Sequence, residues 1–222
     1  MFLSKKNYYI VYIIMNRTSL LYNITYVTKL IIFVIILIIL GFYFKNKYIK
    51  YVGILLLFFI IFFFRNNIGT ITQNNKYFIS PSSSKIKNIG YNENETVIYT
   101  YLSPLDRHFM IAPVDCTITN IENIKIKDSD TERLRVTFKD INENTFSLDQ
   151  IVSKLGQGAW LLKFLYKTRC VVFNKVGDKL EQGQRYGLIR FGSNMQYNLP
   201  KSYKILTTVN SKVKLGDVIA SI

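Results

Sequence analysis

Residues 176–183 read Val176-Gly177-Asp178-Lys179-Leu180-Glu181-Gln182-Gly183, and the apolar stretch 185–191 follows them. Residues 209–216 read Val209-Asn210-Ser211-Lys212-Val213-Lys214-Leu215-Gly216, with the apolar stretch 218–222 behind them. Each copy places a glycine just before an apolar segment, where a hairpin turn needs a residue that tolerates positive φ. The repeat therefore predicts two hairpins, each with a returning strand.

The sequence around this repeat continues the same alternation of short apolar segments and turn signals. Regularly spaced short strands of this kind predict a mainly β domain of the sandwich or barrel-like type. The paired hairpins resemble those of biotinyl- and lipoyl-type β-sandwiches. Residues 152–166 are ambiguous between helix and strand. The predicted strands cover residues 77–80, 96–102, 116–121, 133–138, 170–173, 185–191, 204–208 and 218–222.

The N-terminal part is different because it holds two apolar runs. Residues 30–44 contain no charge, and residues 48–64 contain only Lys50. Each run is shorter than the about 20 residues of an independent bilayer crossing. Joined by Lys45-Asn46-Lys47, they could form a tight membrane hairpin or two helices that thin the bilayer locally. We expect an N-terminal membrane helix pair, integral to a membrane whose compartment and sidedness the sequence leaves open.

The change in composition after residue 64 predicts the domain boundaries. We expect a juxtamembrane segment over 1–29, the helix hairpin over 30–64, a linker over 65–76 and a β domain over 77–222 that carries the chemistry. The net charge of +15 suits an anionic surface, either lipid or nucleic acid. Because the basic residues are scattered rather than gathered into one stripe, we expect anionic membrane lipids and not nucleic acid as partners.

Few side chains in this sequence suit metal or cofactor binding. The chain has two cysteines, Cys116 and Cys170, and a single histidine, His108. These numbers fit neither a disulfide framework nor a zinc or iron site. The sequence also lacks a glycine-rich phosphate loop of the kind that pyridoxal phosphate needs. We therefore expect neither a metal nor pyridoxal phosphate.

Five segments stand in an order that carries a resemblance to a known family. They are Phe62-Phe63-Phe64-Arg65, Ile79-Ser80-Pro81-Ser82-Ser83-Ser84-Lys85-Ile86, Tyr101-Leu102-Ser103-Pro104-Leu105-Asp106-Arg107-His108, Ala112-Pro113-Val114-Asp115 and Gly187-Leu188-Ile189-Arg190-Phe191-Gly192-Ser193, with Leu199-Pro200 behind the last. This ordered set, from about residue 62 to the C-terminus, resembles the short-type, pyruvoyl-dependent phosphatidylserine decarboxylases.

The resemblance implies a zymogen that cuts itself between Gly192 and Ser193. Ser193 Oγ would attack the Gly192 carbonyl to give an ester, and elimination and hydrolysis would then leave a pyruvoyl group at the new N-terminus. The two products would stay associated. The pyruvoyl group would act as electron sink in converting phosphatidylserine to phosphatidylethanolamine and CO2, a step of phospholipid biosynthesis.

The resemblance also implies roles for polar residues of the other segments. His108 would assist self-cleavage and protonate the carbanion after CO2 leaves. Asp106 would orient His108 or cap a turn, and Asp115 has the same two readings; we favour a structural role for both. Ser83 stands where the family usually has an aspartate that resembles the acid of a serine-protease triad. Ser83 can hydrogen-bond His108 but cannot stabilise its cation by charge.

A second interpretation belongs to another class of protein. The chain could be a degenerate, uncleaved homologue that acts as a membrane lipid-binding or scaffold protein. This interpretation rests on Ser83 and on two residues after the processing serine. Asn194 and Gln196 replace the arginine and aspartate that often stand there. We place the enzyme ahead because His108 and the Gly192-Ser193 pair are kept.

Overall fold

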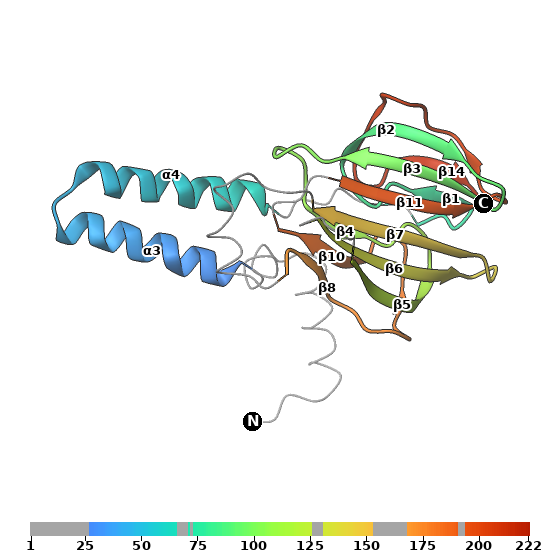
Figure 1. Cartoon of the computed structure of the whole chain (residues 1–222), viewed down its shortest axis with the longest axis horizontal. Helices are drawn as coiled ribbons and strands as arrows, with labels where there is room; N and C mark the ends of the chain where they lie inside the picture. The colour runs from blue at the N-terminus through green and yellow to red at the C-terminus, as the bar shows by residue number, and fades with distance from the viewer. Residues whose placement is uncertain (1–26, 66–70, 72, 126–130, 153–167, 191–193) are drawn as a thin grey trace. The chain divides into compact units, whose positions relative to one another are not determined.

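The structure is a computed structural model that describes residues 27–65, 71, 73–125, 131–152, 168–190 and 194–222 (Figure 1). The chain divides into two compact units, Met1–Ile68 and Gly69–Ile222. The predicted ambiguous stretch 152–166 lies, apart from its first residue, outside the described residues.

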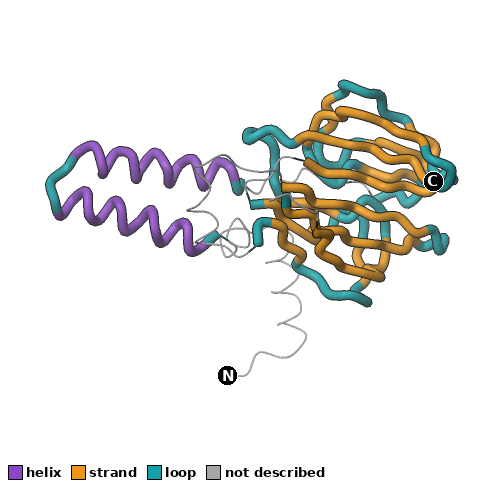
Figure 2. The backbone as a smooth tube through the Cα atoms, viewed as in Figure 1, coloured by secondary structure: helices purple, strands orange, loops and turns teal. Residues whose placement is uncertain are grey.

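The first unit contains a hairpin of two helices, α3 (Thr28–Tyr43) and α4 (Lys47–Phe63) (Figure 2). Its turn ends one helix and begins the next. Lys45 adopts a left-handed conformation with φ of 49°, and the N–H of Asn46 donates to the Gly41 carbonyl at 2.9 Å, as in a Schellman motif. The Asn46 side chain then accepts from the N–H groups of Tyr48 and Ile49, at 3.0 and 3.2 Å, which caps α4.

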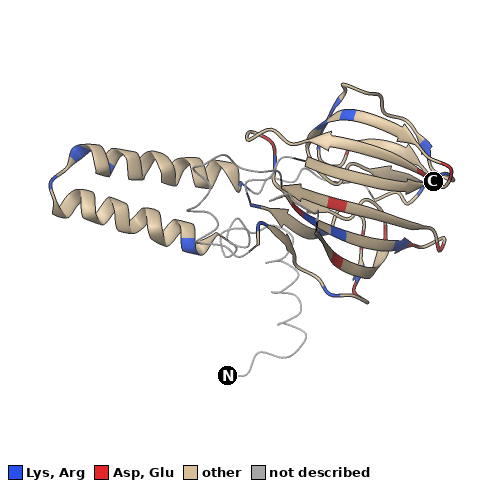
Figure 3. Ribbon diagram, in the orientation of Figure 1, with Lys and Arg blue, Asp and Glu red and all other residues tan. Residues whose placement is uncertain are grey.

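Two glycines let these helices approach closely. A Cβ at Gly41 would lie 2.6 Å from the backbone nitrogen of Lys50, and one at Gly53 would lie 2.6 Å from Ile38 Cγ1. Most large apolar side chains of the hairpin are exposed. Examples are Ile32, Ile39, Phe42, Leu55, Phe58 and Phe62. Charged residues occur only near the helix ends (Figure 3).

The helices contain 16 and 17 residues. Within the described residues, no helix combines the length and apolar character that a membrane crossing requires. The structure therefore gives no support to the expected pair of spanning helices.

The second unit is mainly β, which confirms the predicted class. It has one eight-stranded sheet, in the order β13-β2-β3-β11-β7-β6-β5-β9, and two three-stranded sheets, β4-β10-β8 and β1-β14-β12. A single hydrophobic core joins side chains of all three sheets, among them Ile118, Met110 and Ile219. The strands are β1 (Tyr77–Ile79), β2 (Ser84–Tyr91), β3 (Glu95–Tyr101), β4 (Phe109–Ile111), β5 (Cys116–Lys125), β6 (Glu132–Asp140), β7 (Thr145–Val152), β8 (Cys170–Val172), β9 (Lys179–Leu180), β10 (Arg185–Ile189), β11 (Asn194–Pro200), β12 (Lys204–Ile205), β13 (Lys212–Val213) and β14 (Val218–Ser221).

The internal repeat of the sequence corresponds to a repeat in the fold. Gly177 and its counterpart Asn210 both have positive φ, 93° and 69°, and so do Gly183 and Gly216, 85° and 90°. The short strands of the two copies, β9 and β13, occupy the opposite edges of the eight-stranded sheet. The returning strands, β10 and β14, are the central strands of the two small sheets. The predicted turns and returning strands are thus present, but the predicted hairpins are wrong, because in each copy the short strand and the returning strand lie in different sheets and do not pair.

Candidate functional site

Gly192 and Ser193, the predicted cleavage pair, lie outside the described residues, but the strands on both sides are described. Before the pair, the N–H of Ile189 donates to the His108 carbonyl at 2.8 Å, which extends the pairing of β10 with β4 by one residue. After the pair, Asn194 begins β11 and lies opposite Tyr101 of β3. Both flanks of the predicted cleavage site therefore meet the segment 101–108 that carries the candidate base.

His108 is buried, with 2% of its surface exposed, and its ring is held in one orientation. Nδ1 lies 2.9 Å from the backbone carbonyl oxygen of Asp106. Because a carbonyl oxygen can only accept, Nδ1 must carry the hydrogen of the neutral ring, and the lone pair is then on Nε2. This is the tautomer that a general base needs if the proton is to be taken by Nε2.

The Asp106 side chain serves the turn rather than the imidazole ring. Its Oδ2 accepts from the N–H of Ser103 at 2.8 Å, and its own N–H donates to the Ser103 carbonyl at 2.9 Å. Its Oδ1 lies 3.9 Å from the ammonium group of Lys212, which is largely exposed. Asp106 orients His108 through its backbone carbonyl, while its carboxylate holds the turn that presents that carbonyl.

Ser83 is not brought to the His108 ring in the described part of the chain. Its hydroxyl oxygen accepts from the N–H of Leu215 at 3.1 Å. Leu215 belongs to the second copy of the repeat, just before Gly216. The residue at the position of the family's acid therefore anchors the turn at Gly216.

Asp115 joins two segments that are distant in the sequence. Its carboxylate accepts from the Asn75 side-chain amide at 2.6 Å and from the Gln182 N–H at 2.7 Å. The Asp115 N–H in turn donates to the Asn75 side chain at 3.0 Å. These are the bonds of a structural residue that fastens the approach to β1 against the first copy of the repeat.

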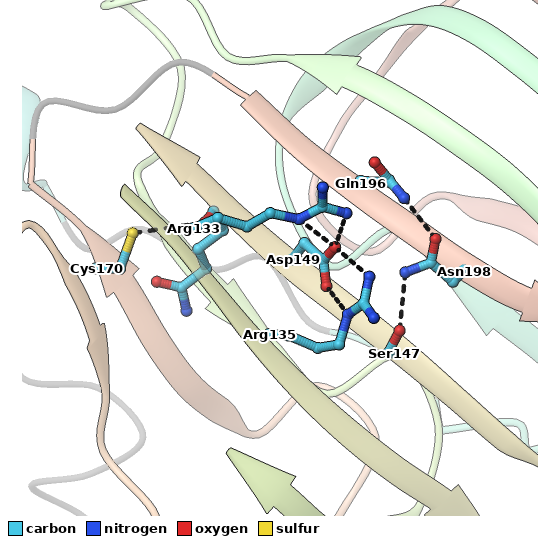
Figure 4. A network of polar contacts seen from close by, with 8 residues as sticks. Arg133, Arg135, Ser147, Asp149, Cys170, Gln196 and Asn198 are labelled. Carbon is cyan, nitrogen blue, oxygen red and sulfur yellow. Dashed lines mark hydrogen bonds and ion pairs between the residues drawn. The ribbon is translucent and has the colours of Figure 1, made fainter. Parts of the chain in front are cut away.

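An ion network that the sequence motifs did not predict lies on the eight-stranded sheet (Figure 4). Asp149 of β7 is fully buried and lies between two arginines of β6. Arg133 Nε and Arg135 Nε each donate to it at 2.8 Å, Arg135 Nη2 donates at 3.0 Å, and Arg133 Nη2 makes a further short contact. The hydrogen bond to Asp149 raises the pKa of Arg135, although burial opposes the shift. Arginines two apart in a strand share one face, and this spacing was the available sequence signal.

Glu132 fixes the start of β8 next to the end of β10. Its carboxylate accepts from the backbone N–H groups of Arg169 and Cys170, each at 2.9 Å. The Arg169 carbonyl then accepts from the N–H of Arg190, at 2.8 Å, two residues before Gly192. Glu132 therefore fixes the backbone of Arg169, which in turn holds the backbone of Arg190 just before the predicted cleavage site.

Cys170 lies in this region but does not have the properties of a nucleophile. Burial raises the pKa of its thiol well above the ordinary value, and the negative charge of Glu132 adds to the effect. The thiol therefore stays protonated at neutral pH, and the thiolate is the reactive form. Among the described residues, no group of histidine, cysteine, aspartate and glutamate side chains could hold a metal ion.

Comparison with known proteins gives a consistent result. A phosphatidylserine decarboxylase from Geotalea uraniireducens, named as a proenzyme, is 30% identical over 125 residues, which cover 56% of this chain and 58% of that relative. The proenzyme of Geobacter sulfurreducens is 30% identical over 57% of each chain. The proenzyme of Streptomyces avermitilis is 28% identical over 62% of this chain and 63% of its own length.

The chain spans less than two thirds of the length of these relatives. No solved structure matches it. The family model described as Phosphatidylserine decarboxylase, however, matches residues 56–221, from the second half of α4 through the whole β unit. With a match of this extent, the chain belongs to the phosphatidylserine decarboxylase family.

Proposed function

We propose that this chain is a self-processing, pyruvoyl-dependent decarboxylase that converts phosphatidylserine to phosphatidylethanolamine and CO2. The observation that carries the proposal is the hydrogen bond from the Ile189 N–H to the His108 carbonyl, because it brings the strand that precedes Gly192-Ser193 next to a buried histidine whose Nδ1 is held by a backbone carbonyl. The family membership supports the same reaction. The names of the relatives, which describe proenzymes, support the enzyme over an uncleaved scaffold protein.

In the proposed cleavage, the base is His108 and the nucleophile is Ser193. Nε2 takes the proton of the Ser193 hydroxyl as Oγ adds to the Gly192 carbonyl, and the proton passes to the nitrogen as the C–N bond breaks. The product is an ester with a free amine on residue 193. Loss of the α-proton expels the Gly192 carboxylate, and water replaces the nitrogen as ammonia, which leaves a pyruvoyl group.

The described residues fit such a group. When formed, it supplies an electron-withdrawing ketone that reacts with a primary amine. His108 would carry the proton that replaces CO2 on carbon. The buried Cys170 thiol stays protonated and does not compete as a nucleophile for the ketone.

The position of β11 supports continued association of the two cleavage products. Residues 194–200 pair with β3 on one side and with β7 on the other, in the interior of the eight-stranded sheet. Met195, Tyr197 and Leu199 belong to the core. A C-terminal product that begins at residue 193 would keep these contacts after cleavage.

We also propose that the α3–α4 hairpin inserts into a bilayer of anionic lipids. Its sides expose large apolar residues, and both ends are basic and aromatic, which is the pattern of a membrane interface. At the turn, Lys50 Nζ lies 5.0 Å from the ring centroids of Phe42 and Tyr51; at the other end, the Arg65 guanidinium lies 4.1 Å from the Phe62 ring. A helix of this length is ~24 Å long, shorter than the ~30 Å of bilayer hydrocarbon, so we propose local thinning around it.

Intact-mass spectrometry and a lipid assay test the proposal together. We expect the purified chain to become two chains, one ending at Gly192 and one starting with a pyruvoyl-blocked residue 193, and to release CO2 from phosphatidylserine. Ser193→Ala should remain a single chain without activity. A wild-type protein that stays uncleaved and binds lipid vesicles without turnover would instead favour the scaffold role.

A further inference from the structure

The side-chain amide of Gln150 is buried, and only its nitrogen makes a hydrogen bond within the described residues. The residue is fully buried in β7, and its Nε2 donates to the Val171 carbonyl at 3.4 Å. Its Oε1 has no hydrogen-bond partner among the residues that the structure describes. Because the Val171 carbonyl fixes the amide nitrogen on one side, the free oxygen is an acceptor on the other. A buried acceptor of this kind is costly unless something donates to it.

Gly187 makes room for this amide. A Cβ at Gly187 would lie 2.6 Å from Gln150 Nε2 and 2.8 Å from the Val171 carbonyl oxygen. A side chain of any kind would therefore displace the amide or separate β10 from β8. The Gln150 amide can therefore occupy this position only because residue 187 has no side chain.

Gln150 also packs against the face of β10 and β4 on which alternation places the candidate base. Gly187 lies opposite Met110 of β4, and His108 precedes Met110 by two residues. Because side chains alternate along a strand, the side chains of His108 and Met110 lie on the face against which the Gln150 amide packs. Gln150 is the cross-strand neighbour of Met195, two residues after Ser193. Its backbone carbonyl accepts from the thiol of Cys170, which lies opposite Ile189.

We propose that Gln150 Oε1 accepts a hydrogen bond from the amino group of the lipid headgroup and so positions the amine for reaction. The inference rests on the proposed function. A serine headgroup offers a phosphate and a carboxylate, which only accept hydrogen bonds, and one amino group, which donates. An acceptor oxygen can therefore bind the amine alone. Gln150 is a positioning and specificity residue, distinct from the base His108.

The test compares processed full-length wild-type protein with Gln150→Met and Gln150→Glu. Methionine has nearly the size of glutamine but no acceptor, whereas glutamate keeps one. The probes are short-chain phosphatidylethanolamine, which retains the amine, and short-chain phosphatidylethanol, which lacks it. Calorimetry gives the Kd of each, and intact mass gives the extent of self-cleavage. Gln196→Met is the matched control, because that amide donates to Asn198 elsewhere on the sheet.

We expect Gln150→Met to cleave itself as the wild type does and to bind the amine lipid ~10-fold or more weakly, with unchanged binding of the amine-free lipid. Gln150→Glu and the control should keep the affinity. Equal losses for both lipids, or no loss for either, would overturn the inference. Slowed cleavage with normal lipid affinity would also overturn it, because the acceptor would then serve the protein backbone. Failure of the wild type itself to cleave or decarboxylate would instead refute the proposed function.

Discussion

Replacing Asp149 by asparagine tests how strongly the ion network holds β6 and β7 together. Asparagine keeps the shape, removes the charge and presents an NH2 group to arginine donors. Asp149 is fully buried, and Arg133 and Arg135 both donate to it. Removing one partner of a buried pair costs about 3–5 kcal/mol. Because the arginine side chains are 20% and 30% exposed, water recovers part of this loss, and we expect about 2–3 kcal/mol.

Urea unfolding followed by circular dichroism gives this free energy directly, and a thermal scan should show a midpoint lower by about 4–12 °C. The experiment is best done on Ser193→Ala, so that cleavage does not change the molecule during the measurement. Glu143→Gln is the control, because its ion pair with Lys139 is exposed and should contribute less than about 0.5 kcal/mol. A loss for Asp149→Asn no larger than that of the control would refute the reasoning.

Three further outcomes are expected. His108→Gln should slow self-cleavage ~10²–10⁴-fold, measured by intact mass over time, whereas Asp106→Asn should keep most of the rate because its backbone carbonyl orients the ring; equal losses would contradict this assignment. Ser83→Asp should leave cleavage nearly unchanged because this side chain binds the Leu215 N–H, and a large acceleration would show that it reaches His108. Burial raises the pKa of the Cys116 and Cys170 thiols above the ordinary 9.0, so these thiols lose their protons at lower pH in the unfolded chain than in the folded one. The free energy of unfolding should therefore be unaffected below pH ~9 and fall above it by ~1.4 kcal/mol per pH unit for each thiol. Denaturation measured over a pH series should show this slope, alanine substitutions should reduce it, and its absence would refute the effect.

Much of the β unit is predictable because its signals are local. Turn glycines, short apolar segments and the repeated hairpin sequence indicate a mainly β domain. Three interior strands of the eight-stranded sheet, β2, β7 and β11, were not predicted. In β11 the buried residues Met195, Tyr197 and Leu199 recur at every second position, and a search for alternation alone would have found them.

The ordered motifs determined the family and nominated His108 and Ser193. They did not reveal the hydrogen-bond partner of any candidate residue. Ser83 takes its partner from Leu215, and Asp115 takes partners from Asn75 and Gln182. Such pairs depend on which strands meet and in what register, and neither is written in the spacing of a motif.

The sequence by itself therefore determined the mainly β class, the repeated turns, the apolar helices and the family. Only the tertiary structure decided that His108 is held by a backbone carbonyl, that Asp149 is buried between two arginines and that Gln150 lies over Gly187. The physical reason is that local conformation follows from neighbouring residues. A site, in contrast, is assembled by strand register across segments that are far apart in the chain.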